Sequence, residues 1–320
     1  PRTGEILESD IGWYHNVMNL LRNWFLIQTS AVNDNSRGVK FKDEVMGELI
    51  RFVSAHEVGH TIGLPHNMGS SSAYHVDSLR SPTFTSNHGV APSIMDYARF
   101  NYVAQPEDGV TNFYPMVGSY DIWSVKWGYT YFDGEDQNSE KRLLNNWVKE
   151  KADNYEYWFG YSNGIDPRSQ TESIGSDNMD ASYYGLLNLK RIVPNLINWT
   201  YEDGKNYDDL KELYLNVYSQ FRRYIGHVST NVGGIYENLK SNDQEGDIYT
   251  HVPKNIQRKA VNFLNSNVFT SLDWLLNKDV INKIENIGVQ ERVRSIHEFT
   301  LRRLFDYSRL ARMLENETMN

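Results

Sequence analysis

Three of the nine histidines in this 320-residue chain fall within the eleven residues HEVGHTIGLPH. His56 and His60 are four residues apart, so on a helix their rings lie on one face, about one turn apart. Two imidazole nitrogens placed in this way can bind one Zn²⁺ at about 2.0–2.1 Å. The spacing therefore predicts a metal site, with Zn²⁺ as the cofactor.

A third ligand and a general base follow from the same stretch. Gly63 is the residue type that ends a helix in the left-handed conformation, so His66 can turn back toward the same metal. Three protein ligands leave one position for water, as a catalytic zinc site requires. Glu57 is offset from the first ligand by about 100° around the helix axis, which places its carboxylate beside the metal. A carboxylate there can take the proton of a metal-bound water, so Glu57 is the predicted general base.

Three elements must position these residues. Residues 43–60 predict a helix, because an apolar stripe recurs at helical spacing and the first two histidines extend it. Downstream, SIMDY at residues 93–97 predicts a tight turn, with Met95 beneath the ligands as an apolar floor. A further helix is predicted at residues 119–132, with Ser119 or Asp121 as its cap.

The composition excludes several classes of protein. The hydrophobic content of 40% is enough for a buried core, and the net charge of −9 leaves no basic stripe for nucleic acid. Without cysteine, the chain has neither disulfides nor thiolate metal ligands. No run of residues approaches the roughly 18 apolar residues of a membrane span. The chain begins at Pro1 with neither an initiator methionine nor a signal peptide, and we interpret it as a mature fragment or an excised piece of a longer protein.

Hydrophobic periodicity predicts a mainly helical chain in two parts. Residues 2–7 predict a short strand or extended segment, and residues 69–115 a loop-rich region. The remaining helices are predicted at residues 11–28, 140–159, 180–191, 207–226, 229–240, 254–268, 270–286 and 289–314. A polar break at 133–140 separates residues 1–135, which hold the metal motif, from an all-helical domain at 136–320. The predicted fold class is α+β, predominantly helical, with few strands.

The combination of HEVGHTIGLPH and SIMDY resembles the metzincin clan of zinc peptidases, in which a long zinc motif is followed by a methionine turn. The closer resemblance is to the large bacterial envelope proteins of the Met-zincin family. It is carried by SSAYHVDSLRSPTF, SIMDYARFNYVAQPEDG and YDIWSVKWGY, and it continues through GLLNLKRIVPNLINWT and QRKAVNFLNSNVF. The resemblance implies a zinc endopeptidase that acts on a protein or peptide. It also implies a secreted, cell-envelope or periplasmic location, and further domains of a longer polypeptide.

The resemblance implies roles for individual residues. The three histidines correspond to the zinc ligands, Glu57 to the general base and Met95 to the methionine of the turn. Tyr97 resembles a tyrosine that some metzincins use as an extra zinc ligand or as a hydrogen-bond donor to the transition state; a buried structural tyrosine is the alternative. Metzincins normally carry several strands ahead of the active-site helix, including the edge that binds substrate. Only residues 1–42 precede the predicted helix, so those strands are expected to be missing here.

The sequence leaves other functions open. A non-catalytic binding module, or a degenerate peptidase fragment, would fill the fourth zinc position with a protein side chain such as Tyr97 or His75. A zinc hydrolase acting on something other than a peptide is a third alternative. His75 and His88 are otherwise expected to be exposed loop histidines. The spaced acidic residues at 165–182 lack a calcium-loop pattern and are more typical of a solvated linker.

Overall fold

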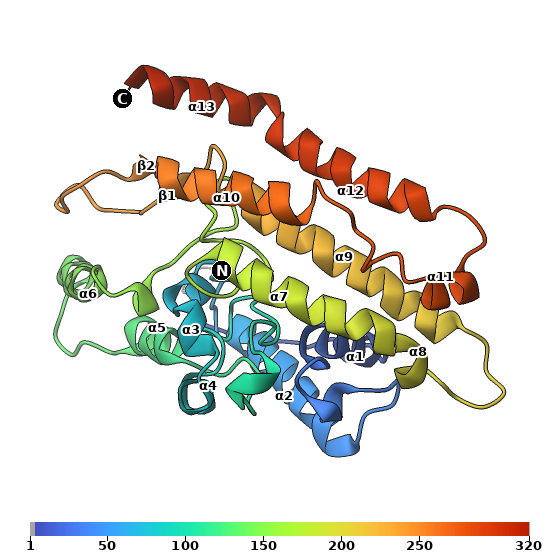
Figure 1. The fold of residues 1–320 in the computed structure, drawn as a ribbon. Helices are drawn as coiled ribbons and strands as arrows, with labels where there is room; N and C mark the ends of the chain where they lie inside the picture. The colour runs from blue at the N-terminus through green and yellow to red at the C-terminus, as the bar shows by residue number, and fades with distance from the viewer. Residues whose placement is uncertain (1–3, 320) are drawn as a thin grey trace.

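The structure, a computed structural model, describes residues 4–319 and is predominantly helical with one small sheet (Figure 1). Its α-helices are α1 (Asn16–Thr29), α2 (Asp43–Thr61), α3 (Val76–Leu79), α4 (Pro82–His88), α5 (Ser119–Tyr129), α6 (Gln137–Lys151), α7 (Asn178–Ile192), α8 (Leu196–Trp199), α9 (Asp208–Thr230), α10 (Lys254–Asn267), α11 (Lys278–Ile284), α12 (Val289–Leu304) and α13 (Tyr307–Met319). The 3₁₀ helices are η1 (Asp34–Ser36), η2 (Ser70–Ala73), η3 (Pro106–Asp108), η4 (Tyr155–Tyr157) and η5 (Val193–Asn195). Strands β1 (Ile235–Glu237) and β2 (Tyr249–His251) pair antiparallel, with Ile235 opposite His251. The predicted α+β, predominantly helical fold class is confirmed.

Most predicted helices are present, and the corrections lie at chain breaks. The helix predicted at 229–240 is wrong, because α9 ends at Thr230 and the chain turns through Gly233, at a φ of 63°, into β1. The segment 270–286 becomes helical only from residue 278, after the Asn277 side chain caps α11. The long helix predicted at 289–314 is two helices, and Asp306 caps the second by accepting from the backbone N–H of Arg309 at 3.0 Å.

The N-terminal prediction is also corrected. The first helix begins at residue 16 and not at residue 11. Of the strand or extended segment predicted at 2–7, residues 2 and 3 lie outside the described residues, and residues 4–7 form no strand. Within residues 4–319, both strands follow α9, so none precedes α2. The described residues therefore offer no sheet edge ahead of the histidine motif.

Two clusters of buried apolar side chains hold the fold together. The smaller cluster joins α1 and α2 to the segments that follow the methionine turn, and it includes Leu21, Phe52, Met95 and Phe100. The larger cluster surrounds α9, which packs against α1, α7, α10 and α12. Burial of each such side chain contributes roughly 1.5–3 kcal/mol. The larger cluster contains residues from both sides of residue 135, among them Leu26, Tyr102, Leu189, Leu213 and Ile296.

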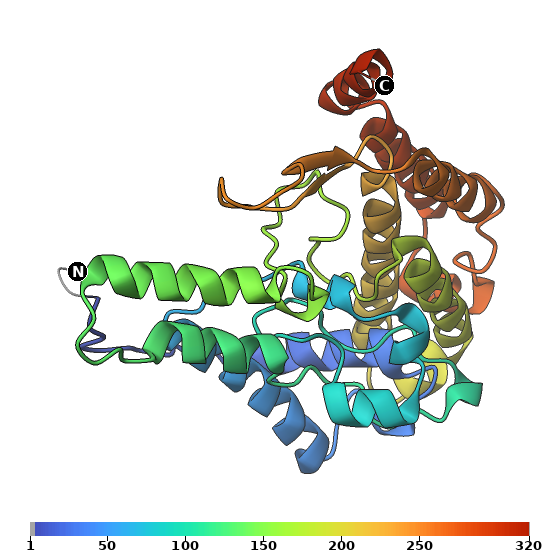
Figure 2. The ribbon, with the colours of Figure 1, turned by 90° about the vertical axis from the view of Figure 1, so that its left-hand side faces the viewer.

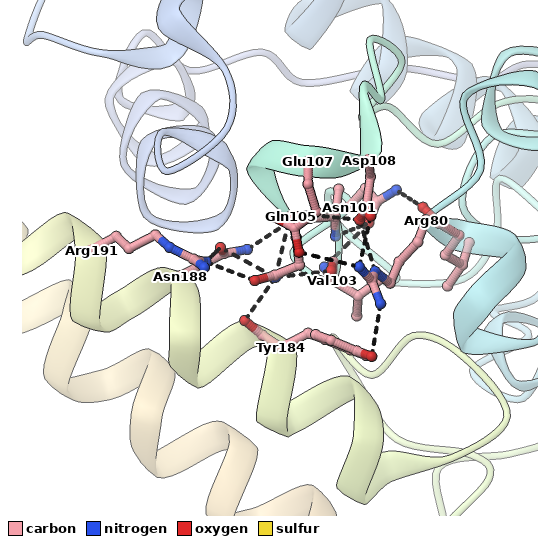
Figure 3. A network of polar contacts seen from close by, with 11 residues as sticks. Arg80, Asn101, Val103, Gln105, Glu107, Asp108, Tyr184, Asn188 and Arg191 are labelled. Carbon is pink, nitrogen blue, oxygen red and sulfur yellow. Dashed lines mark hydrogen bonds and ion pairs between the residues drawn. The ribbon is translucent and has the colours of Figure 1, made fainter.

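A polar network fastens the segment 101–108 to α7 (Figure 3). The Gln105 side chain donates to the Tyr184 carbonyl and to Asn188 Oδ1, both at 3.3 Å. Arg80 makes a two-pronged pair with Asp108, at 2.8 and 2.7 Å, and donates to the Tyr184 hydroxyl at 2.7 Å. Such paired charge-assisted bonds fix orientation as well as distance. The domain boundary between residues 135 and 136 stays a prediction, and both the network and the larger core cross it.

Helices α5 and α6 lie side by side and extend away from the helices around α9 (Figure 2). The polar break predicted near 133–140 includes the turn between them, and Asp136 caps α6 by accepting from the backbone N–H of Ser139 at 2.8 Å. The indole N–H of Trp127 donates to the Leu144 carbonyl at 3.2 Å and joins the pair. In the part of the chain that the structure describes, no helix has the length and apolar character needed to cross a membrane.

Candidate metal centre

The first two histidines lie on one face of α2, as their spacing predicts. His56 is buried, with 3% of its surface exposed, and His60 is half-buried. The Nδ1 atom of His56 lies 2.7 Å from the Ile94 carbonyl, and Nδ1 of His60 lies 2.8 Å from the Leu64 carbonyl. A carbonyl only accepts, so each Nδ1 carries the hydrogen and each Nε2 keeps a free lone pair. The backbone thereby fixes the tautomer that binds a metal.

The third histidine is returned to the first two by the helix end. The N–H of Gly63 donates to the His60 carbonyl and the N–H of Leu64 to the Gly59 carbonyl, both at 3.0 Å. This bonding pattern ends a helix with one left-handed residue, and Gly63 has a φ of 90°. The reversal sends the chain back along α2, and His66 comes to face the two helical ligands. The predicted role of Gly63 in the helix end is confirmed.

The three Nε2 atoms converge on one point. Nε2 of His66 lies 3.1 Å from that of His56 and 3.0 Å from that of His60. A single shared proton would satisfy only one of these contacts, whereas a cation satisfies all three lone pairs. Three nitrogens around Zn²⁺ at its usual bond length lie about 3.3 Å apart in a tetrahedral site. The histidine cluster, defined as His56, His60 and His66, therefore fits zinc in both geometry and donor type, and it can hold a metal ion.

Burial favours the neutral forms of His56 and His66, which are the forms that bind a cation. Burial lowers the pKa of His56 to about 4, with smaller contributions from His60 and His66 and with the hydrogen bond to Ile94 opposing the change. The pKa of His66 is also lowered, by burial first and then by His60. Imidazoles bind metals in their neutral form, so protons do not compete for these two nitrogens near neutral pH.

The methionine turn packs against the ligand helix at Gly59. Met95 is fully buried, and its Sδ lies 2.3 Å from where a Cβ on Gly59 would be. A side chain at Gly59 would therefore displace Met95, so the glycine between the ligands allows the turn to approach the helix. The N–H of Asn67 donates to the Met95 carbonyl at 3.1 Å, which fastens the loop after His66 to the same turn.

Asp121 of α5 fastens the methionine turn from the other side. Its carboxylate accepts from Ser93 Oγ at 2.5 Å, from the Ile94 N–H at 2.7 Å and from the Gly118 N–H at 2.9 Å. Burial raises the pKa of Asp121, and these hydrogen bonds oppose that rise. The prediction that Asp121 caps its helix is confirmed by the bond from Gly118. Because the Ile94 carbonyl orients His56, the same carboxylate also positions the first ligand.

Glu57 and Tyr97 lie beside the cluster, on an apolar cavity. The cavity has a volume of about 200 Å³, and both residues line it together with His56 and side chains of α1 that include Leu20 and Trp24. The Tyr97 ring stacks on His56 at a centroid distance of 5.1 Å and lies 4.4 Å from the ring of His66. The structure therefore brings all of the predicted site residues together, while the catalytic roles of Glu57 and Tyr97 stay predictions.

Two residues to which the sequence analysis gave no role at this site hold Tyr97 in place. The Arg99 guanidinium lies over the rings of Trp24 and Tyr97, at 3.6 and 4.7 Å from their centroids. Arg99 Nε lies 3.4 Å from Glu172 Oε1, and the Glu172 N–H donates to the Tyr97 carbonyl at 2.8 Å. Burial lowers the pKa of Arg99, and Glu172 opposes that change.

Arg99 and Glu172 also share a backbone feature. Within residues 4–319 they are the two non-glycine residues with a positive φ, 62° in each case. Such conformations cost on the order of 1–3 kcal/mol and persist where surrounding contacts hold them. The solvated linker predicted at 165–182 is wrong here, because Glu172 is only 3% exposed. Arg99 lies two residues after Tyr97, so its position in the sequence could have indicated a place near the site. The position of Glu172 gave no such indication.

The remaining candidates lie elsewhere. His75 is exposed, caps α3 and lies 3.6 Å from Asp77, and His88 is an exposed residue stacked on Phe84. Both are exposed, as expected, but His88 is the last residue of α4 and does not lie in a loop. Among the described residues, His56, His60 and His66 are the one group of histidine or acidic side chains close enough to hold a metal. The acidic residues at 165–182 pair instead with basic side chains: Asp166 with Arg168, Glu172 with Arg99 and Arg223, and Asp177 and Asp180 with Lys259.

A ligand helix ended by a left-handed glycine, three convergent imidazoles and a methionine turn packed against the helix together define a zinc metallopeptidase type of fold. Comparison with models of protein families places the chain more narrowly. The family described as Met-zincin matches residues 38–320, so the chain belongs to the Met-zincin family. No curated protein and no solved structure matches the chain.

Proposed function

We propose that the chain is a zinc-dependent endopeptidase. The observation that carries the proposal is the convergence of the three histidine Nε2 atoms. Nε2 of His66 lies 3.1 Å from that of His56 and 3.0 Å from that of His60. His56 and Glu57 both line the adjacent cavity. A zinc that only braced a fold would be enclosed by four protein ligands. Here His66 and Glu57 are half-buried, so the cluster faces a space that water and substrate can reach.

The chemistry divides between the metal and the chain. Bound Zn²⁺ would act as a Lewis acid that polarises the scissile carbonyl and lowers the pKa of a water molecule. Glu57 would take a proton from the attacking water as its oxygen bonds to the carbonyl carbon. Glu57 would then return that proton to the amine nitrogen as the C–N bond breaks. One carboxylate thus serves as base and then as acid, and atoms and charge balance over the cycle.

We propose that the Tyr97 hydroxyl donates a hydrogen bond to the oxyanion that forms when water attacks the scissile carbonyl. Its ring is held between the histidine rings and the Arg99 guanidinium, which limits the positions of its hydroxyl. A preorganised donor aimed at developing negative charge typically contributes on the order of 10²–10³-fold to the rate. The resemblance also implies that Tyr97 could be an extra zinc ligand, and the same ring position beside the histidines is compatible with that role.

The apolar cavity beside Glu57 supports a preference for substrates with a bulky apolar side chain. Its lining is contributed by α1, α2 and the segment after the methionine turn, and Leu20, Trp24 and Phe52 supply apolar surface. A volume of about 200 Å³ is suited to one large aliphatic or aromatic side chain. We propose that this side chain lies next to the scissile bond. In the described residues no strand flanks the site, so the contacts that this part of the chain offers to the substrate come from side chains.

The alternatives make different demands on the site. A non-catalytic zinc module would need a fourth protein ligand, and no fourth histidine or acidic group joins the cluster within the described residues. A hydrolase for non-peptide substrates would use the same water and base, and it is separated by assay on ester and amide substrates. The secreted or cell-envelope location and the further domains implied by the resemblance are part of the proposal, and cell fractionation tests the location.

The experiment is Glu57→Gln, with Glu44→Gln on the exposed face of the same helix as the control. The substrates are unstructured proteins and quenched peptides, assayed with zinc-loaded protein. Loss of a general base typically costs on the order of 10²–10⁴-fold in rate. We expect Glu57→Gln to retain one zinc and lose activity by this factor, and Glu44→Gln to cleave like the wild type. Wild-type rates in Glu57→Gln, or no cleavage of any peptide by the zinc-loaded wild type, would contradict the proposal.

A further inference from the structure

A second cavity lies among α9, α12 and the segment 162–171, and its lining shares no residue with the cavity beside Glu57. Its volume is about 470 Å³, and it opens to solvent. Three arginines line it, Arg222 and Arg223 from α9 and Arg303 from α12. No aspartate or glutamate is among its lining residues. We call it the arginine cavity.

The positive charge of the arginine cavity is only partly compensated, since Asp306 acts on Arg303 without forming an ion pair with it. Arg222 lies over the Phe299 ring at 4.4 Å and forms no ion pair with any described residue. Arg303 donates to neutral acceptors, the Gly226 carbonyl at 3.3 Å and the Thr230 hydroxyl at 3.0 Å. In a chain with a net charge of −9, two arginines without a carboxylate partner at one cavity mark a local reversal of charge.

The third arginine shares its only counter-charge. Arg223 Nε lies 3.0 Å from Glu172 Oε2, and the other oxygen of Glu172 faces Arg99. One carboxylate therefore faces two guanidinium groups, which leaves the cavity side short of negative charge. An anion in the cavity would supply that missing charge.

The lining also contains buried polar atoms without partners. Ser169 is 1% exposed and its Oγ makes no hydrogen bond, and the same holds for Nδ1 of His227, which is 4% exposed. Nε of Arg303 is a third such atom. Buried polar groups in native proteins are nearly always satisfied, so three unpartnered atoms in residues that line one cavity indicate hydrogen-bonding capacity that the described chain does not use.

The orphans include both donors and an acceptor. His227 Nε2 lies 2.9 Å from the Thr171 carbonyl, so Nε2 carries the hydrogen and Nδ1 keeps a lone pair. Burial, with smaller contributions from Arg223 and Arg303, lowers the pKa of His227 to about 4 against the hydrogen bond to Thr171, so the ring is neutral near pH 7. The guanidinium groups demand acceptors from the ligand, whereas His227 demands a donor such as a hydroxyl.

We propose that the arginine cavity binds a phosphate group, free or esterified, with phosphate oxygens on the arginines and an O–H of the ligand facing His227. Guanidinium groups from two helices, α9 and α12, line the cavity, and several such donors suit a tetrahedral oxyanion with several acceptor oxygens. Ser169 Oγ would donate to a further oxygen. The same oxyanion occurs in inorganic phosphate and in a phosphorylated polyol, and the cavity has room for either.

The test is titration of the zinc-loaded whole chain with inorganic phosphate, with glycerol 3-phosphate and with citrate, at constant ionic strength. The readouts are calorimetry and the shift in Tm. We expect saturable binding of both phosphates and none of citrate. Tighter glycerol phosphate assigns the cavity to a phosphorylated polyol, equal affinities assign it to inorganic phosphate, and either result supports the proposal. Absence of saturable phosphate binding, or equal binding of citrate, overturns it.

Variants locate the binding. Arg222→Ala removes a guanidinium whose recorded contacts are with aromatic rings, so the chain should fold, and phosphate affinity should fall by at least about tenfold. Ser169→Ala deletes a hydroxyl with no partner, so Tm without ligand should stay unchanged while affinity falls. Arg302→Ala, an exposed neighbour on α12, is the matched control and should bind like the wild type. An equal loss in all three variants would overturn the assignment to this cavity.

Discussion

The histidine cluster and the arginine cavity are two polar sites with opposite demands. At the cluster, three lone pairs face one another, with Nε2 of His66 3.0–3.1 Å from its two neighbours, so the missing partner is a cation. At the arginine cavity, Arg222 and Arg303 face open space without carboxylates, so the missing partner is an anion. In each case the unsatisfied groups define the charge of the ligand.

The two sites also differ in how the chain builds them. The ligands of the cluster lie within eleven residues of sequence, on a helix and the turn that ends it. The arginine cavity combines Ser169, Arg222 and Arg303, which are far apart in the sequence and meet only through the packing of α9 and α12. A local site can be specified by spacing alone, whereas a distributed site depends on the whole core.

Glu172 lies between the two sites. Its backbone N–H holds the Tyr97 carbonyl, and its carboxylate faces Arg99 on the side of the cluster and Arg223 on the side of the cavity. The following predictions test how independent the two sites are.

The largest expected effect is on metal binding in His60→Ala. Removing one of three ligands should lower zinc affinity on the order of 10³-fold, given that apparent zinc affinities in small metal sites reach about 10–16 kcal/mol. The phosphate titration should not change, because the arginine cavity shares no lining residue with the cluster. Zinc titration of metal-free protein measures the first effect, and the exposed His75→Ala is the control. A parallel loss of zinc and phosphate binding would refute the separation of the sites.

Glu172→Ala is expected to affect both regions together. It leaves Arg99 and Arg223 without their buried partner, and breaking a buried pair in this way costs about 3–5 kcal/mol. Urea unfolding should therefore show this loss, and Glu172→Gln should lose less because the amide keeps hydrogen-bonding capacity. Glu107→Ala, whose side chain is 67% exposed, is the control and should change stability little. Wild-type stability in Glu172→Ala would show that the link between the sites is not energetic.

Asp121→Asn tests the support of the cluster from outside. The amide can still accept one hydrogen bond but repels one of the N–H donors that now bond the carboxylate, so the methionine turn should loosen and His56 should lose orientation. Outer-shell changes of this kind typically lower metal affinity about 10- to 100-fold. Zinc titration is the measurement, with the exposed Asp133→Asn as the control. Equal zinc affinities for both variants would show that Asp121 does not support zinc binding.

Leu20→Asp is expected to have the smallest effect and to act on substrate binding alone. Leu20 is 43% exposed at the cavity beside Glu57, so the variant should fold. A charge in an apolar pocket should raise KM about tenfold for peptides with a bulky apolar side chain, with kcat little changed. Val261→Asp, 47% exposed on α10, is the control. An unchanged KM would show that the substrate side chain does not bind in this cavity.

The sequence predicted the parts of the molecule that depend on local spacing. The helix at 43–60 and the stop at Gly63 follow from short-range patterns, and the structure has both of them. The helix predicted at 229–240 failed because periodic apolar residues do not show where a left-handed Gly233 turns the chain.

Residues held by distant contacts escaped prediction. Glu172 resembles any acidic residue of a polar stretch, and only the fold shows that its carboxylate is buried between two arginines. Arg303 and His227 likewise belong to helices with ordinary amphipathic patterns, and their shared cavity exists only in three dimensions. Pairings over long sequence separations leave no local spacing to detect.

The most direct test of the account is the zinc content of the whole chain, measured after zinc loading and dialysis for the wild type, Glu57→Gln and His66→Ala. The account predicts one zinc per chain in the wild type and in Glu57→Gln, and none retained in His66→Ala, because three imidazoles hold the metal and Glu57 lies beside it. Zinc retained by His66→Ala, or lost from Glu57→Gln, would contradict the three-histidine site and the separate role of the glutamate.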